Sequence, residues 1–128
     1  MPTTWKLRSI LAASAVSLGF ALLAGTPAAE ARPQYVKEFI LKYPDLKPEI
    51  TKVKNCGVCH GGENGADKMV RNNYGESLMK LLGEINVKDA ATIKTAMDKA
   101  ADEKSATDGK SFGELIKEGK LPGESTAE

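Results

Sequence analysis

The feature that most constrains this 128-residue chain is a cluster of its rarest reactive side chains. The sequence contains two cysteines and one histidine, and all of them lie between residues 56 and 60. The cluster reads Cys56-Gly57-Val58-Cys59-His60. Because there is no other Cys or His, any thiol or imidazole chemistry of this chain must use this segment. The fold must therefore be one that presents these residues together.

The spacing of the cluster matches the C-x-x-C-H attachment signature of c-type haem. Cysteines at positions i and i+3 lie on one side of a helical turn, so both sulfurs can reach the two vinyl groups of one porphyrin. The adjacent His60 then offers its imidazole as the proximal iron ligand. Gly57 and Val58 are a spacer whose small residues let a porphyrin lie close to the backbone. The pattern predicts one covalently attached haem c held by Cys56, Cys59 and His60.

Other uses of two thiols and an imidazole fit the sequence less well. A structural zinc site needs four ligands, and this chain lacks a second cysteine pair. A thioredoxin-type redox pair is expected in a βαβ setting, which the sequence pattern does not indicate. A disulfide between Cys56 and Cys59 would be strained and would close a very small loop.

The N-terminal residues have the pattern of a secretory signal peptide. Lys6 and Arg8 precede an uncharged apolar run over residues 10–25, and Ala29-Glu30-Ala31 forms a small-x-small cleavage pattern. The apolar run is shorter than the roughly 20 residues of a membrane-spanning helix, although an uncleaved anchor is the alternative. We therefore expect residues 1–31 to be removed on export to the periplasm or another compartment outside the cytoplasm. The exported chain would have no stable membrane insertion.

The remaining chain shows helical periodicity punctuated by Gly, Pro and Asn. Apolar residues recur on one helix face from Tyr35 to Tyr43, and Pro44 stops that helix. In no stretch do apolar and polar residues alternate with period two, so we predict an all-α domain over residues 32–122. We also predict a loop over residues 61–65 and a flexible tail over residues 123–128. Further helices are predicted after Pro48, from an N-cap at Asn73 to a stop at Gly83, after a cap at Asp89, and from the Ser111–Glu114 capping box to Gly119 and Pro122.

The composition limits both the core and the partners. The chain has only three Phe, three Tyr and one Trp, and the Trp lies in the predicted signal peptide, so a bound cofactor is expected to supply apolar bulk. The 18 basic and 17 acidic residues nearly balance, which gives no reason to expect nucleic-acid binding. Lys52, Lys54, Lys68 and Arg71 flank the motif and could steer an acidic redox partner, but the interleaved acidic residues favour an ordinary solvated surface.

Together, the export pattern, the helical pattern and residues 56–60 resemble a small monohaem c-type cytochrome. The resemblance implies a small cytochrome c-like helical domain around a covalently attached haem, often with a methionine as second axial ligand. This chain departs from the family in two places: its first helix ends at Tyr43, well before Cys56, and no Pro-flanked methionine loop lies near the C-terminus. Arg71, Asn72, Asn73 and Tyr74 are candidate donors to the haem propionates.

The sixth iron position has three methionine candidates, because no second histidine exists. Met97 lies at i+4 from Ile93 on an inward helix face, and it has the longest tether from His60, so it is the preferred ligand. Met79 lies on the helix before it, and Met69 follows His60 closely. For each of them the alternative is a core methionine that fills an irregular gap. A vacant site is the remaining possibility.

The function depends on that position. An iron held by His and Met exchanges electrons and does not bind substrates. Since no further His or Cys is present, the polypeptide offers no catalytic residues, and we do not expect an enzyme. The first hypothesis is an exported carrier of single electrons between redox partner proteins. The alternatives are a pentacoordinate haem protein that binds or senses a diatomic gas, and a haem subunit of a larger oxidoreductase.

Overall fold

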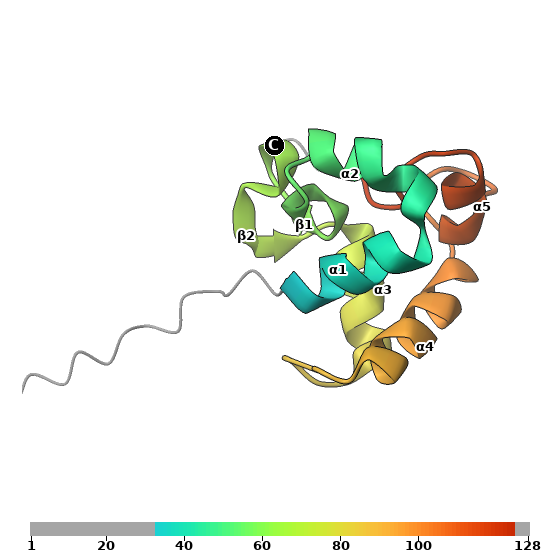
Figure 1. Ribbon diagram of the computed structural model, residues 1–128. Coiled ribbons are helices and arrows are strands. Elements are labelled where there is room, and N and C mark those ends of the chain that lie inside the picture. Colours follow the sequence, from blue (N-terminus) through green and yellow to red (C-terminus); the bar gives the residue numbers. More distant parts are fainter. Residues whose placement is uncertain (1–32, 125–128) are drawn as a thin grey trace, which may run out of the picture.

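The computed structural model describes residues 33–124 and consists mainly of helices, with one small antiparallel sheet (Figure 1). The predicted signal peptide lies outside the described residues. The elements follow in the order α1 (Pro33–Lys42), η1 (Pro44–Leu46), α2 (Lys47–Lys52), η2 (Cys56–Val58), β1 (His60–Gly61), η3 (Glu63–Gly65), β2 (Asp67–Arg71), α3 (Asn73–Leu82), α4 (Ala90–Ala101) and α5 (Phe112–Lys117).

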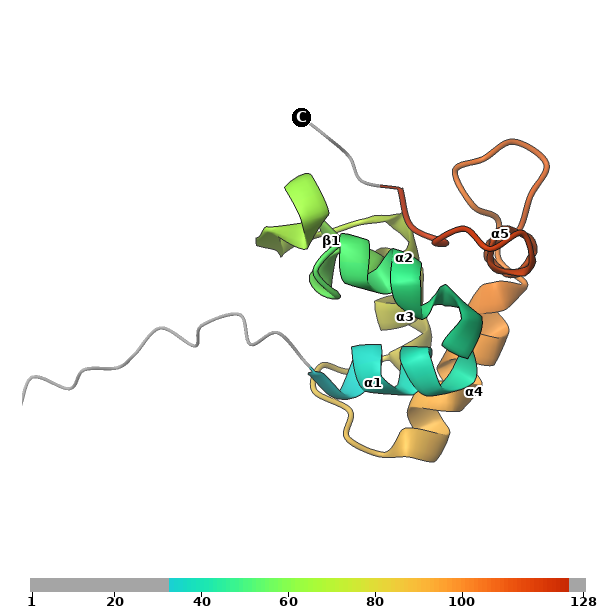
Figure 2. The same ribbon diagram turned by 45° about the horizontal axis from the view of Figure 1, so that its top comes forward.

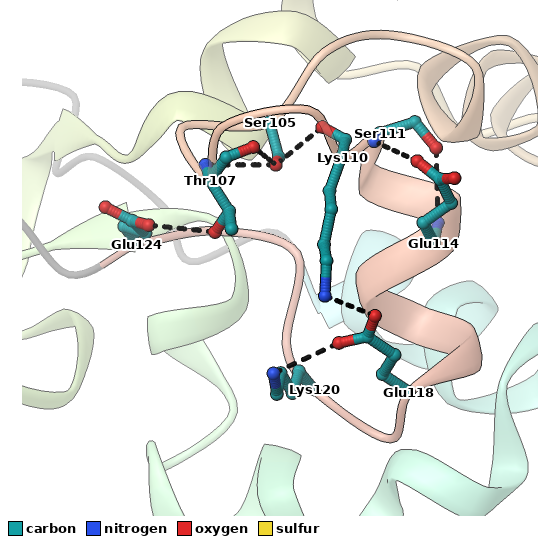
Figure 3. A network of polar contacts seen from close by, with 8 residues as sticks. All are labelled: Ser105, Thr107, Lys110, Ser111, Glu114, Glu118, Lys120 and Glu124. Carbon is teal, nitrogen blue, oxygen red and sulfur yellow. Dashed lines mark hydrogen bonds and ion pairs between the residues drawn. The ribbon is translucent and has the colours of Figure 1, made fainter.

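The helices begin and end mostly where the local signals predict. Pro44 follows the end of α1, and Gly83 ends α3 in the left-handed conformation at φ 72°. The Asp89 side chain accepts a hydrogen bond from the Thr92 N–H at 2.8 Å and caps α4. Ser111 and Glu114 form the predicted capping box of α5, with reciprocal bonds of 3.2 and 2.7 Å (Figure 3).

Two local predictions differ from the structure. The N-cap of α3 is Asn72, one residue before the predicted Asn73, because the Asn72 side chain accepts from the N–H of Gly75. The segment after the motif is also more ordered than the predicted loop. His60 pairs with Arg71 and Gly61 with Asp67 in an antiparallel hairpin that a bulge interrupts, so the all-α prediction lacked this small sheet.

The helices surround one apolar core, and α4 packs against α1, α3 and α5. Tyr74 lies at its centre and is fully buried. Its ring makes edge-to-face contacts with Phe39 of α1, at 5.6 Å between ring centroids, and with Phe112 of α5, at 5.3 Å. Figures 1 and 2 both place β1 and β2 at the opposite end of the molecule from α5.

The connection between α4 and α5 is a polar loop that folds on itself. Ser105 donates to the Lys110 carbonyl at 2.8 Å and accepts from the Thr107 N–H at 3.1 Å (Figure 3). An isolated β-bridge joins Lys104 to Ser111. Lys110 also forms an ion pair with Glu118 beyond the end of α5. These bonds pair several polar groups of the loop with one another or with Glu118, and the loop lies at the end of the molecule away from β1 and β2 (Figure 1).

Candidate haem-attachment site

A tight turn with unusual backbone angles leads into the cysteine motif. Lys54 and Asn55 both have positive φ, at 51° and 64°, in the left-handed region that non-glycine residues rarely adopt. The Cys56 N–H then donates to the Lys54 carbonyl at 2.7 Å. This turn reverses the chain after α2, so the motif begins as the short 3₁₀ turn η2.

The 3₁₀ turn places both cysteines on the same side of the backbone. A 3₁₀ helix has three residues per turn, so residues i and i+3 eclipse one another. The Cys59 N–H donates to the Cys56 carbonyl at 3.2 Å, and both thiols are free. Burial raises the pKa of the Cys59 thiol to about 12, the nearby Cys56 thiol adds to the rise, and the Arg71 guanidinium opposes it. The Cys59 thiol is therefore protonated at neutral pH.

Both cysteines and His60 line one pocket of 220 Å³ between the motif and the start of α1. Its other wall consists of Pro33, Tyr35 and Val36, and Lys54 and Asn55 complete the lining. The Tyr35 hydroxyl accepts a hydrogen bond from the Val87 N–H at 2.9 Å, which ties this end of α1 to the segment before α4. The structure thus brings together three of the predicted site residues, Cys56, Cys59 and His60.

The imidazole of His60 is oriented by the small sheet. Its Nδ1 lies 3.2 Å from the Val70 carbonyl oxygen on β2. A carbonyl can only accept, so Nδ1 is the donor in this contact, and in the neutral imidazole Nε2 then keeps its lone pair for a ligand. A histidine that ligates a metal is commonly held in this way by its other nitrogen. The sequence pattern did not indicate this contact, because a backbone carbonyl has no side-chain signature.

Asn72 is hydrogen-bonded to the cysteine motif through both its side chain and its backbone. Its side-chain amide donates to the carbonyls of Gly57 and Val58, both at 3.1 Å, and accepts from the Gly75 N–H at 2.9 Å. Its backbone N–H donates to the Cys59 carbonyl at 2.9 Å. The side chain is 1% exposed, so the propionate-donor hypothesis does not fit Asn72 in this position.

Several glycines at or near the motif have neighbouring atoms so close that they leave no room for a Cβ. A Cβ at Gly75 would lie 2.1 Å from the Cys59 carbonyl oxygen, and one at Gly65 would lie 2.3 Å from Gly57 N. A Cβ at Gly57 itself would meet the Val53 Cβ at 2.6 Å. The small size of Gly57 is thus required by its contact with Val53, a reason that differs from the predicted approach of a porphyrin.

The three candidate methionines lie apart from the pocket. Met97 on α4 is 1% exposed within the core, and Met79 on α3 lines a separate open groove of 770 Å³. Met69 on β2 is 82% exposed. None of the methionines within residues 33–124 lines the pocket with His60.

The basic residues near the motif are partly paired with acidic ones. Lys52 forms an ion pair with Glu49, and the Arg71 guanidinium lies 3.8 Å from the Glu76 carboxylate.

Within the described part of the chain, no three His, Cys, Asp or Glu side chains converge as a metal-binding group. No helix among residues 33–124 is long and apolar enough to cross a membrane.

Comparison with known proteins found no relative of this chain. No protein-family model, no curated protein and no solved structure matches the chain.

Proposed function

We propose that this chain is an exported monohaem c-type cytochrome that carries single electrons between redox partner proteins. Cys56 and Cys59 would hold the haem covalently, and His60 would bind its iron. The observation that carries the proposal is the pocket that Cys56, Cys59 and His60 line together, with both cysteines free and Nδ1 of His60 bonded to the Val70 carbonyl.

The residues at the pocket fit such a group. Thioether attachment adds each thiol S–H across one vinyl C=C, with the sulfur bonding to one carbon and the hydrogen going to the other. The reaction therefore needs two reduced cysteines and consumes no oxidant, and both cysteines are free thiols. Pro33, Tyr35 and Val36 offer an apolar wall to the ring, and His60 offers Nε2 to the iron.

The pocket accommodates only part of a porphyrin. Its 220 Å³ is below the roughly 300–1,000 Å³ typical of small-molecule sites. A haem attached there would extend beyond the pocket toward solvent or displace the start of α1. An exposed edge suits electron exchange, for which a bound haem supplies an iron that cycles between the ferric and ferrous states.

Optical spectra and acid–acetone extraction test the attachment. The chain produced with a haem-maturation system should keep its haem through extraction, and Cys56→Ser or Cys59→Ser should weaken that retention. The Cys56→Ser/Cys59→Ser variant should lose it entirely. His60→Ala is the matched variant within the motif: it should keep covalent haem but change the spectrum. A double cysteine variant with extraction-resistant haem would refute the proposal.

A second function has one observation in its favour. Because no methionine of the described residues lines the pocket, the iron could have an open sixth position and bind a diatomic gas. Carbon monoxide separates the two functions. A reduced holoprotein whose spectrum is unchanged by carbon monoxide is an electron carrier with a filled sixth position, whereas a shifted spectrum supports gas binding.

Export is proposed from residues 1–31 of the sequence. N-terminal sequencing of the protein recovered from the periplasm should find Arg32 as the first residue. A mature chain that still begins with the apolar run would instead indicate a retained anchor.

A further inference from the structure

Both polar atoms of the Asn72 side-chain amide are hydrogen-bonded, and they reach two different elements. An asparagine amide can donate two hydrogen bonds from Nδ2 and accept at Oδ1. Here Nδ2 donates to the successive carbonyls of Gly57 and Val58, the two residues between the cysteines, while Oδ1 caps α3 through the Gly75 N–H. One buried side chain thus joins the cysteine turn to the start of a core helix.

The cysteine turn depends on such external bonds. As a 3₁₀ turn it is short, and its internal bonds are the Cys59 N–H to Cys56 carbonyl contact at 3.2 Å and the Val58 N–H to Asn55 carbonyl contact at 3.4 Å. Both lengths are at or beyond the long end of the usual N–H···O range, and hydrogen-bond geometry in a 3₁₀ turn is poorer than in an α-helix. The Asn72 bonds at 3.1 Å and the Asn72 N–H to Cys59 bond at 2.9 Å connect the turn to α3.

The C-terminal segment keeps the Asn72 amide in place. A Cβ at Gly123 would lie 2.3 Å from Nδ2 of Asn72, so the backbone at Gly123 covers the amide closely. Pro122 is fully buried, and the Glu124 N–H donates to the Asn73 side chain at 2.9 Å. The amide therefore cannot turn away from the two carbonyls without displacing this segment.

We propose that Asn72 is a positioning residue for haem attachment, which sets the orientation of the cysteine turn and hence of both thiols and His60. The inference rests on the proposed function. In each attachment the thiol sulfur bonds to a vinyl carbon and the thiol hydrogen goes to the neighbouring carbon, so both sulfurs must lie against the same ring once both bonds have formed. Asn72 acts through the backbone of Gly57 and Val58 and touches neither thiol in this role.

Asn72→Asp separates positioning from helix capping. Aspartate is as good an N-cap as asparagine, so the bond to Gly75 is kept. Its carboxylate cannot donate to the two carbonyls and repels them. We expect a smaller fraction of full-length chains with covalent haem, measured by intact mass, and a shifted Soret band and reduction potential in the fraction that carries it. Asp89→Ala, which removes the cap of α4 at a site outside the motif, is the matched control and should keep the parent spectrum and potential.

A second variant covers the case in which Asn72→Asp does not fold. Gly123→Ala should press on Nδ2 and reduce haem attachment while leaving Asn72 unchanged. If Asn72→Asp folds and matches the parent in haem content, spectrum and potential, the positioning role is refuted and the haem site stands. The same holds if Asn72→Asp is unfolded and Gly123→Ala matches the parent. If the parent itself carries no covalent haem, the proposed function fails, and the role of Asn72 fails with it.

Discussion

The hydroxyl groups of two core tyrosines have opposite surroundings. The buried Tyr74 hydroxyl has no hydrogen-bond partner among the described residues, whereas the Tyr35 hydroxyl accepts from the Val87 N–H at 2.9 Å. An unsatisfied buried hydroxyl costs free energy, so Tyr74→Phe should raise the free energy of unfolding by about 1 kcal/mol. Tyr35→Phe leaves the Val87 N–H unpaired and should lower it by about 1–3 kcal/mol. Urea unfolding of both variants checks the pair, and a marked loss of stability in Tyr74→Phe would contradict the expectation.

Met97 can serve as a core residue or as an iron ligand, and one variant distinguishes these roles. It is 1% exposed on α4, beside Ile93, Ala96 and Ala100, which are also buried. In this packing we expect Met97→Ala to lower the free energy of unfolding by about 2–5 kcal/mol and to leave the haem spectrum unchanged. Its role as sixth ligand stays a prediction. That role requires Met97→Ala to lower the reduction potential and to permit carbon monoxide binding that the parent resists.

At the scale of elements, the first turn of α3 packs directly on the cysteine motif. A Cβ at Gly75 would lie 2.1 Å from the Cys59 carbonyl oxygen, so Gly75→Ala must separate the helix from the motif. We expect it to lower the free energy of unfolding by about 1–3 kcal/mol and to reduce haem attachment. Gly113→Ala on α5 is the control: its Cβ would lie 2.9 Å from the Ala101 carbonyl oxygen, away from the motif. It should lose some stability but keep its haem.

The start of α4 has a cap that depends on pH. Hydrogen bonds from the Thr92 hydroxyl and then from the Thr92 N–H lower the pKa of Asp89 below its ordinary value of 3.8. A carboxyl whose pKa is lower in the folded state stabilises the fold above its ordinary pKa, and this contribution is lost as pH falls through the folded-state pKa. Asp89→Asn keeps a capping oxygen but does not titrate. The stability difference between parent and variant should therefore change only below about pH 4, as measured by urea unfolding across that range. An equal difference at all pH values would contradict this expectation.

At the scale of the whole molecule, the proposed haem would connect the start of α1 to the cysteine motif. Its pocket is formed by α1 on one side and by the cysteine motif on the other. A group bonded to both thiols and packed on α1 binds the folded state only and should stabilise it. We expect Cys56→Ser/Cys59→Ser to unfold at a lower temperature than the haem-loaded parent, as followed by circular dichroism. Equal midpoints would mean that the haem does not bridge these elements.

Some features of this protein could be predicted from the sequence because their causes lie within a few residues. Pro44 prevents α1 from continuing, Gly83 adopts a left-handed angle, and the side chains of Asp89 and Ser111 bond N–H groups within the next three residues. The same holds for the grouping of Cys56, Cys59 and His60, which are neighbours along the chain. The spacing makes these residues neighbours, but the pocket that they line depends on α1, which forms its other wall.

Other features were decided by contacts between residues distant in sequence. The strand β2 is exposed at four successive positions, so it has no buried face and produces no alternating pattern. The pattern of Asn73 followed by Glu76 suggested the wrong cap, because Asn72 is selected by the Gly57 and Val58 carbonyls that its amide also reaches. Periodicity placed Met97 on an inward face, but only the packing of α4 against α1, α3 and α5 determines that this face meets the core and not the His60 pocket. Local signals determine where helices begin and end, whereas the partner of each buried face depends on how the helices pack together.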